Sequence, residues 1–187
     1  MNQIPTMLHP STCCLLVIDP QEKLMKVMSK PAKVIKNSVL MIKLAQTLQI
    51  PILATTQYKK GLGPFVPEIQ EALNETLCID KMEFNSFLNP DFRKALSELP
   101  ASINTLLITG VEAHICIYQT ALGAMHHGYT PWVIADATSS RDKKNHKLAI
   151  KRLSSVGAAV GPAEMAVYEL LARADSDEFK AMRPYLT

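Results

Sequence analysis

The sequence predicts an α/β fold, with one domain built on a doubly wound parallel sheet of six strands. Its length of 187 residues suits a single hydrophobic core. Six short runs are almost wholly apolar, as strands covered on both faces are, and helical segments with short connections separate them. Such alternation is typical of right-handed crossovers that place helices on both faces of a sheet. The runs are residues 13–18, 51–55, 77–79, 105–109, 132–135 and 158–160.

The helices are predicted from spacing and capping residues. The clearest has apolar residues three and four apart and lysines on its other side. These apolar residues are Ile35, Val39, Ile42, Ala45 and Leu48. Asn89 and Pro90 begin another helix, and a third covers about residues 114–127 and ends at Gly128, a left-handed C-cap. The core of the single domain is expected over about residues 11–174, followed by a polar tail, 175–187, that packs on a neighbour or frays.

Charge and cysteine content narrow the class of protein. The formal net charge is only +3, and the lysines gather along two helices as solvated faces, so no nucleic-acid partner is predicted. No apolar run reaches the ~18 residues of a membrane span, and the N-terminus lacks a signal-peptide pattern, which predicts a cytoplasmic protein with no membrane partner. The four cysteines form no CxxC pair and the histidines are scattered, so no structural zinc site is expected.

Ligands of such sheets bind beyond the carboxyl ends of the strands, where the strand order reverses. Asp19 follows the first apolar run, Lys81 follows the third, and Cys116 lies in the first turn of the helix after the fourth. In the common Rossmann-like order 3-2-1-4-5-6, strands one and four are neighbours at the reversal point. We therefore expect Asp19 and Cys116 to face one crevice.

These residue types suit nucleophilic chemistry, although each has a simpler role open to it. The positive end of a helix favours a thiolate at Cys116, but most free cysteines are buried small apolar residues. Asp19 at a strand end suits a general base or a backbone cap. Lys81 suits a cation that balances charge or a surface lysine paired with Asp80 or Glu83. Together the three could deprotonate a thiol and stabilise a developing oxyanion.

Competing motifs are weak. Gly61 and Gly63 lack the third glycine of a dinucleotide fingerprint, and no GxxxxGK[ST] occurs, so a nucleotide-binding protein is disfavoured. His114 is two residues from Cys116, but residues at i and i+2 of a helix point to different faces. A Cys-His pair is therefore not expected.

Three segments together resemble the isochorismatase-like cysteine hydrolase family. They read LLVIDPQEKL around Asp19, DKMEFNSF around Lys81 and TGVEAHICIYQTALGAM around Cys116. The similarity extends over roughly residues 13–172 and looks most like the isochorismatase domain-containing branch. The resemblance implies an α/β/α sandwich, a catalytic triad of Asp19, Lys81 and Cys116, and a homo-oligomer.

The resemblance also implies a mechanism. Asp19 takes the thiol proton and later gives it to the leaving group, Cys116 attacks a carbonyl to form a thioester, Lys81 holds the pair in register, and water releases the acid. The family's non-proline cis peptide maps to the bond between Val111 and Glu112. It would turn the N–H of Glu112 into an oxyanion hole with that of Cys116.

The sequence differs from the nicotinamidases of this family at their metal-binding motif, and this difference restricts the substrates to be expected. Their metal-binding Asp-x-His motif is replaced by Thr55-Thr56-Gln57-Tyr58, so neither a metal nor an organic cofactor is expected. Some isochorismatases proper lack the cysteine, so the presence of Cys116 favours amide-like chemistry on a C–N bond.

Residues near the strand ends are candidates for contacts with a small, planar substrate, as an aromatic wall and as amide groups. These candidates are Gln21, Gln57, Tyr58, Phe84 and Asn85. Core packing suits Phe84 and Phe87 equally well. A further set after the fifth strand suits an anionic group or, more simply, the cap of the next helix. It consists of Ser139, Ser140 and Arg141.

The sequence therefore predicts a cysteine hydrolase that cleaves a C–N bond of a small amide-like molecule. The alternative is a non-catalytic binding or scaffold protein with the same fold, which an unreactive Cys116 would favour.

Overall fold

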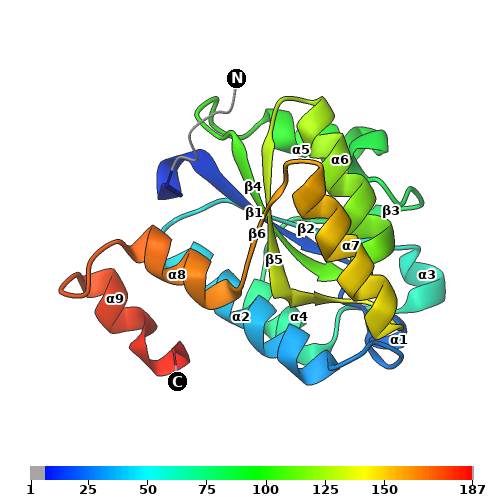
Figure 1. Ribbon diagram of the computed structural model, residues 1–187, viewed down its shortest axis with the longest axis horizontal. Coiled ribbons are helices and arrows are strands. Elements are labelled where there is room, and N and C mark those ends of the chain that lie inside the picture. The colour runs from blue at the N-terminus through cyan, green and yellow to red at the C-terminus, as the bar shows by residue number, and fades with distance from the viewer. Residues whose placement is uncertain (1–6, 187) are drawn as a thin grey trace.

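The protein is built on a six-stranded, wholly parallel sheet (Figure 1). The computed structural model describes residues 7–186. The strand order is β3-β2-β1-β4-β5-β6, which confirms the predicted order and its reversal at β1 and β4. The strands are β1 (Cys13–Ile18), β2 (Ile52–Gln57), β3 (Cys78–Lys81), β4 (Thr105–Val111), β5 (Thr130–Ser139) and β6 (Ala159–Gly161).

Helices cover both faces of the sheet and complete three layers, as predicted (Figure 1). Side chains of β1 alternate between two cores, with Leu15 and Val17 in one and Leu16 in the other. The first core is covered by α2 (Pro31–Thr47), α4 (Pro67–Leu73), α8 (Ala163–Leu171) and α9 (Asp177–Met182), and the second by α5 (Pro90–Ser97), α6 (Tyr118–His126) and α7 (Lys143–Ser155). Shorter pieces are α1 (Glu22–Met25), α3 (Lys59–Leu62), η1 (Pro10–Thr12), η2 (Ser86–Leu88), η3 (Ala113–Ile117) and η4 (Arg183–Tyr185). Among residues 7–186, no helix is long and apolar enough to cross a membrane.

The fifth strand is longer than the sequence predicts. After a shift in register, β5 resumes pairing with β4, so that Gly110 lies opposite Thr138 and Val111 opposite Ser139. The extension brings residues 139–141 to the sheet edge at which β4 ends.

Part of the predicted tail is a helix that packs on the same chain. Ser176 Oγ accepts the N–H of Phe179 (3.1 Å) and caps α9. Met182, on the same face of the helix, is fully buried against α2, with its sulfur 3.5 Å from Thr47 Oγ1. The partly buried Phe179 side chain packs against the same core. Met182 and Phe179 therefore hold the helix on the domain, although the residues around them are polar.

A close approach between β1 and β4 requires glycine at position 110. Gly110 has a φ of +114°, and a Cβ there would lie 1.9 Å from the carbonyl oxygen of Ile18. Asp19 follows this carbonyl directly, and its own backbone is left-handed with a φ of 56°. Gly110 therefore lets β4 pass beside the turn that presents the Asp19 carboxylate.

Replacing Gly110 with alanine should destabilise the protein severely, because the added methyl group meets backbone rather than a movable side chain. We expect G110A to lower the free energy of unfolding by more than ~3 kcal/mol or to prevent folding. The control is G128A, because Gly128 also has a positive φ (+83°) but no atom within 4 Å of an added Cβ. G128A should cost only ~1–2 kcal/mol in urea unfolding, and equal losses in the two variants would contradict the steric argument.

Candidate active site

Three strand ends bring Asp19, Lys81 and Cys116 together. Asp19 follows β1 and Lys81 ends β3, and Lys81 Nζ lies 2.6 Å from Asp19 Oδ2, with both side chains fully buried. Cys116 lies in the turn after β4, and a hydrogen bond joins its side chain to that of Asp19. A carboxylate, an ammonium group and a thiol thus meet at the carboxyl edge of the sheet.

The Asp19 carboxylate is held from two sides. Thr55 Oγ1 donates to Asp19 Oδ1 (2.7 Å), while Lys81 holds Oδ2. The N–H of Asp19 donates to the carbonyl of Thr55 (3.0 Å), so β2 fixes both the main chain and the side chain. Because both oxygens have partners, the buried carboxylate is kept in one orientation.

Gln57, predicted for the substrate pocket, is a direct partner of Lys81. Lys81 Nζ donates to Gln57 Oε1 (2.8 Å), and Gln57 Nε2 donates to the carbonyl of Met82 (2.7 Å), which fixes the orientation of the amide. Gln21 is fully buried, and its side chain bonds the N–H and the carbonyl of Gln57 and the carbonyl of Gly63. Gln57 therefore fixes the position of the Lys81 ammonium group, and Gln21 fixes the backbone of Gln57.

Cys116 lies in a π-helical turn, η3, that leads directly into α6. The peptide bond between Val111 and Glu112, just before this turn, is cis. Cys116 is only 6% exposed. A hydrogen bond from the backbone of Glu112 lowers the pKa of the thiol, so it is donated by the N–H of that residue. The N–H of Glu112 therefore points at the sulfur.

Residues that follow β5 make hydrogen bonds and an ion pair to the turn η3 and to Glu112 just before it. The buried Glu112 carboxylate accepts the N–H of Arg141 (2.9 Å) and pairs with its guanidinium group (3.1 Å). Ser140 Oγ lies 2.9 Å from His114 Nδ1, and Ser139 Oγ donates to a backbone carbonyl before α2. The three side chains considered for an anion thus contact the protein itself, and two of them position η3.

Burial decides the protonation of the site. Desolvation raises the pKa of Asp19, and the neighbouring ammonium group of Lys81 opposes that rise. Burial, followed by the charge of Asp19, raises the pKa of Cys116 to about 12, against the opposing effects of Lys81 and the Glu112 N–H. The expectation of a thiolate is wrong for the resting site, because burial and a carboxylate outweigh the helix start. Cys116 rests as a thiol.

Of the other residues predicted for the substrate pocket, two are exposed to solvent and one caps a short helix. Tyr58 and Phe84 have exposed fractions of 44% and 52%, and the N–H of Tyr58 donates to the carbonyl of Lys81 (3.0 Å). Asn85 caps η2 by accepting the N–H of Phe87 (3.0 Å), and Phe87 is a core residue. Two of the predicted pocket residues, Tyr58 after β2 and Phe84 after β3, are therefore exposed.

Sequence reasoning missed Thr55 as a partner of Asp19 and the pairing of Glu112 with Arg141. Thr55 ends the second apolar run, and a hydroxyl at that strand end was the available signal. No sequence signal joins Glu112 to Arg141, because only the shifted register of β4 and β5 brings them together.

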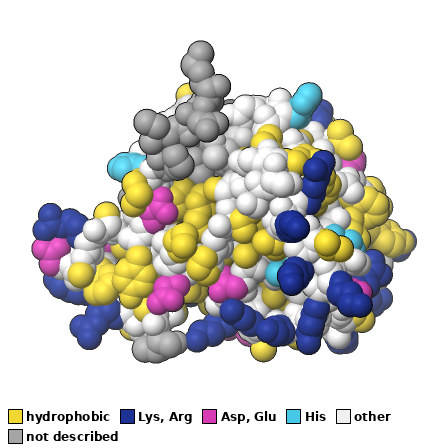
Figure 2. Space-filling view, viewed as in Figure 1, with side chains coloured by type: hydrophobic (Ala, Val, Ile, Leu, Met, Phe, Trp, Pro, Cys, Tyr) yellow, Lys and Arg dark blue, Asp and Glu magenta, His cyan; other side chains and the backbone are white. Residues whose placement is uncertain are grey.

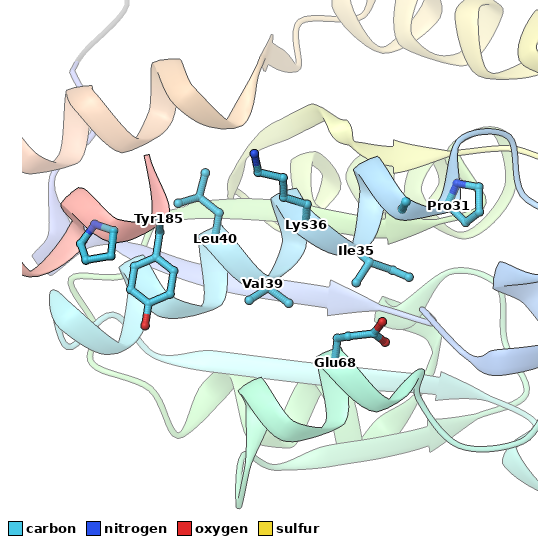
Figure 3. Close-up of a pocket in the computed structure, with 9 residues that line it drawn as sticks. Pro31, Ile35, Lys36, Val39, Leu40, Glu68 and Tyr185 are labelled. Carbon is cyan, nitrogen blue, oxygen red and sulfur yellow. The ribbon is translucent and has the colours of Figure 1, made fainter. Parts of the chain in front are cut away.

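Residues 7–186 also contain a hollow that is separate from the site of Asp19, Lys81 and Cys116. A hollow of about 660 Å³ lies between α2, α4 and η4, and Figure 3 shows apolar side chains of α2 with Glu68 and Tyr185 around it. None of the three residues that meet at the sheet edge lines it. In this part of the chain no group of three or more His, Cys, Asp or Glu side chains could hold a metal ion.

The sequence and the fold of this chain match known proteins. The Isochorismatase domain family matches residues 13–165. The chain belongs to the isochorismatase family. It is 33% identical to a secreted isochorismatase effector of Phytophthora sojae over 94% of this chain and 84% of that protein. It is 31% identical to isochorismatase family protein 1A of Dictyostelium discoideum over 95% and 87% of the two chains.

Solved structures of the same family share the fold. MAR1 ribonuclease of Caenorhabditis elegans is 30% identical with a TM-score of 0.89, covering 97% of this chain and 92% of its own. YcaC of Escherichia coli, described as an octameric hydrolase of unknown specificity, is 26% identical with a TM-score of 0.88, covering 98% and 95%. The chain is therefore an isochorismatase-like hydrolase.

Removing the charge of Asp19 should lower the pKa of Cys116. In D19N the carboxylate no longer opposes ionisation and Lys81 loses its partner, so both changes favour the thiolate. The pH midpoint of iodoacetamide alkylation at Cys116, followed by peptide mass spectrometry, should fall by at least ~1 unit. Exposed Cys78, on which the charge of Asp19 has only a minor effect, is the internal comparison and should shift less. An unchanged midpoint in folded D19N would show that the two groups are not coupled.

Proposed function

We propose that this hydrolase cleaves a C–N bond of a small amide-like molecule through Cys116, Asp19 and Lys81. The supporting observation is the contact between a buried ion pair and a thiol, with the N–H of Glu112 directed at the sulfur. This arrangement supplies a nucleophile, a proton acceptor and an oxyanion donor around one point.

In the proposed reaction, Cys116 Sγ attacks the carbonyl carbon as its proton passes to the Asp19 carboxylate. The N–H groups of Glu112 and Cys116 bind the oxyanion of the tetrahedral intermediate. The C–N bond then breaks, and Asp19 returns the proton to the departing nitrogen, which leaves an acyl thioester on Cys116. Water attacks the thioester while Asp19 accepts a proton. Collapse releases the carboxylic acid, and Asp19 returns its proton to the sulfur, which restores the thiol and the Asp19 carboxylate.

Lys81 keeps charge balanced through these steps. At rest its ammonium group pairs with Asp19, and once Asp19 carries the proton the same group stabilises the developing negative charge on sulfur. Gln57 holds the ammonium group in place through Oε1. The steps use groups of the chain alone, so we propose no metal or organic cofactor.

A small, uncharged reacting group suits this site. The charges of Asp19 and Lys81 compensate one another, and the thiol is nearly buried, so little unpaired charge is offered to a substrate. The exposed rings of Tyr58 and Phe84 can stack on a planar substituent. The C. elegans relative is named a ribonuclease, but a thiol nucleophile favours a carbonyl carbon over the phosphorus of RNA.

A screen of small amides that detects released ammonia or amine tests the reaction. C116S should lower kcat by ~1,000-fold or more, whereas C78A, which removes an exposed thiol of β3, should retain activity. Acid-quenched samples should carry the acyl group on the Cys116 peptide. Full activity in C116S would refute the mechanism.

The alternative is a non-catalytic binding protein with the same fold. It would be favoured if no amide were cleaved and if an activated ester failed to acylate Cys116 in the folded protein.

We also propose a homo-oligomer. The E. coli relative is described as octameric, and this chain exposes apolar side chains after β3, with exposed fractions of 64% for both Met82 and Leu88. Sedimentation velocity should give a mass that is a multiple of the chain mass, and L88E should lower it if this surface is the interface. A monomer at micromolar concentration would contradict the proposal.

A further inference from the structure

A second hollow at the carboxyl edge of the sheet is lined by lysines. It has a volume of about 360 Å³ and lies between the start of α2, the end of β5 and the start of α7. Lys30 and Lys33 line it from the side of α2 and Lys143 from α7, and no member of the proposed triad lines it. Figure 2 shows Lys and Arg side chains gathered over the starts of these two helices, at the lower right.

The lysines are only partly neutralised. Within the described part of the chain, Lys30 and Lys143 have no ion pair, and Asp136 is the one acidic residue that lines the hollow. Asp136 Oδ2 lies 3.5 Å from Lys33 Nζ, and its Oδ1 accepts the N–H of Ala163 (2.7 Å). Among the described residues only Lys33 pairs with the carboxylate of the hollow, which leaves the charges of Lys30 and Lys143 without an ion-pair partner.

The floor of the hollow is polar and fixed in shape. Thr138 Oγ1 donates to the carbonyl of Ala135 (2.9 Å) and lies 3.1 Å from His146 Nε2. Burial lowers the pKa of His146, so its ring is neutral at neutral pH and adds no charge. Ser139 Oγ is held by the carbonyl of Ser29. These groups satisfy one another, which leaves the ammonium groups as the donors available to a ligand.

We propose that this hollow binds the phosphate group of a small molecule, at a site separate from the hydrolytic centre. A phosphate dianion matches the charges of Lys30 and Lys143, and its oxygens can accept charge-assisted hydrogen bonds from several lysines at once. The volume falls within the range of small-molecule sites rather than that of an extended groove. The phosphate is either the free inorganic ion or part of a phosphomonoester.

Titration of the full chain with inorganic phosphate and with glycerol 3-phosphate, at constant ionic strength, tests the proposal by calorimetry and by amide chemical shifts. We expect saturable binding that K30E and K143E each weaken by about tenfold. The matched controls are K26E and K151E, which make the same charge change at exposed lysines that do not line the hollow. They should stay within about twofold, because both lysines lie outside the hollow and salt screens their charges over that separation.

The outcomes separate the ligand sources and the alternatives. Tighter binding of glycerol 3-phosphate would support a phosphomonoester, and tighter binding of inorganic phosphate would support the free ion. Absence of saturation by both would overturn the proposal, as would equal weakening by all four substitutions. Preferential binding of a short RNA, weakened equally by all four, would replace the hollow with an extended nucleic-acid surface. Because these lysines lie outside the triad, amide hydrolysis is tested independently.

Discussion

The buried ion pair between Lys81 and Asp19 is the interaction on which the site depends. Removing two full charges from water costs several kcal/mol per ion, and their attraction offsets that cost only when the remaining hydrogen-bonding positions are also filled. Here Thr55 takes the second carboxylate oxygen and Gln57 accepts from the ammonium group. The pair is thus stable only as part of a four-residue network, and that network spans the ends of β1, β2 and β3.

The sheet supplies the geometry that this network requires. Gln57 and Lys81 are direct partners in the register of β2 and β3, and Thr55 pairs with Ile18 just before Asp19. Cys116, the proposed nucleophile, comes from the other side of β1, because β4 lies next to β1 where the strand order reverses. Gly110 permits the close passage of β4 at that point. One reversal of strand order therefore joins an acid-base pair to a thiol.

Much of the fold is readable from the sequence, because strands buried on both faces must be apolar throughout and polar residues at their ends then stand out. Strand order alone predicts that Asp19 and Cys116 meet, and the resemblance to the family adds Lys81 to them. The role of Gln57 cannot be predicted in this way, because it depends on the register between β2 and β3. Helix α9 cannot be predicted either, because its two apolar packing residues lie in an otherwise polar segment. The extra length of β5 follows from a register shift that no local pattern marks.

The protonation state of Cys116 cannot be predicted from its local sequence. The start of a helix argues for a thiolate, but desolvation and a neighbouring carboxylate are properties of the assembled site, and together they raise the thiol pKa to about 12. A free thiolate at neutral pH is therefore strongly disfavoured in the resting site. In the proposed mechanism, proton transfer to Asp19 avoids a free thiolate, because burial raises the pKa of this carboxyl as well and the proton moves between two groups already in contact. The negative charge leaves Asp19 as it appears on sulfur, and Lys81 compensates it in both places. A neutral resting thiol is therefore compatible with nucleophilic catalysis, provided that proton transfer and attack occur together.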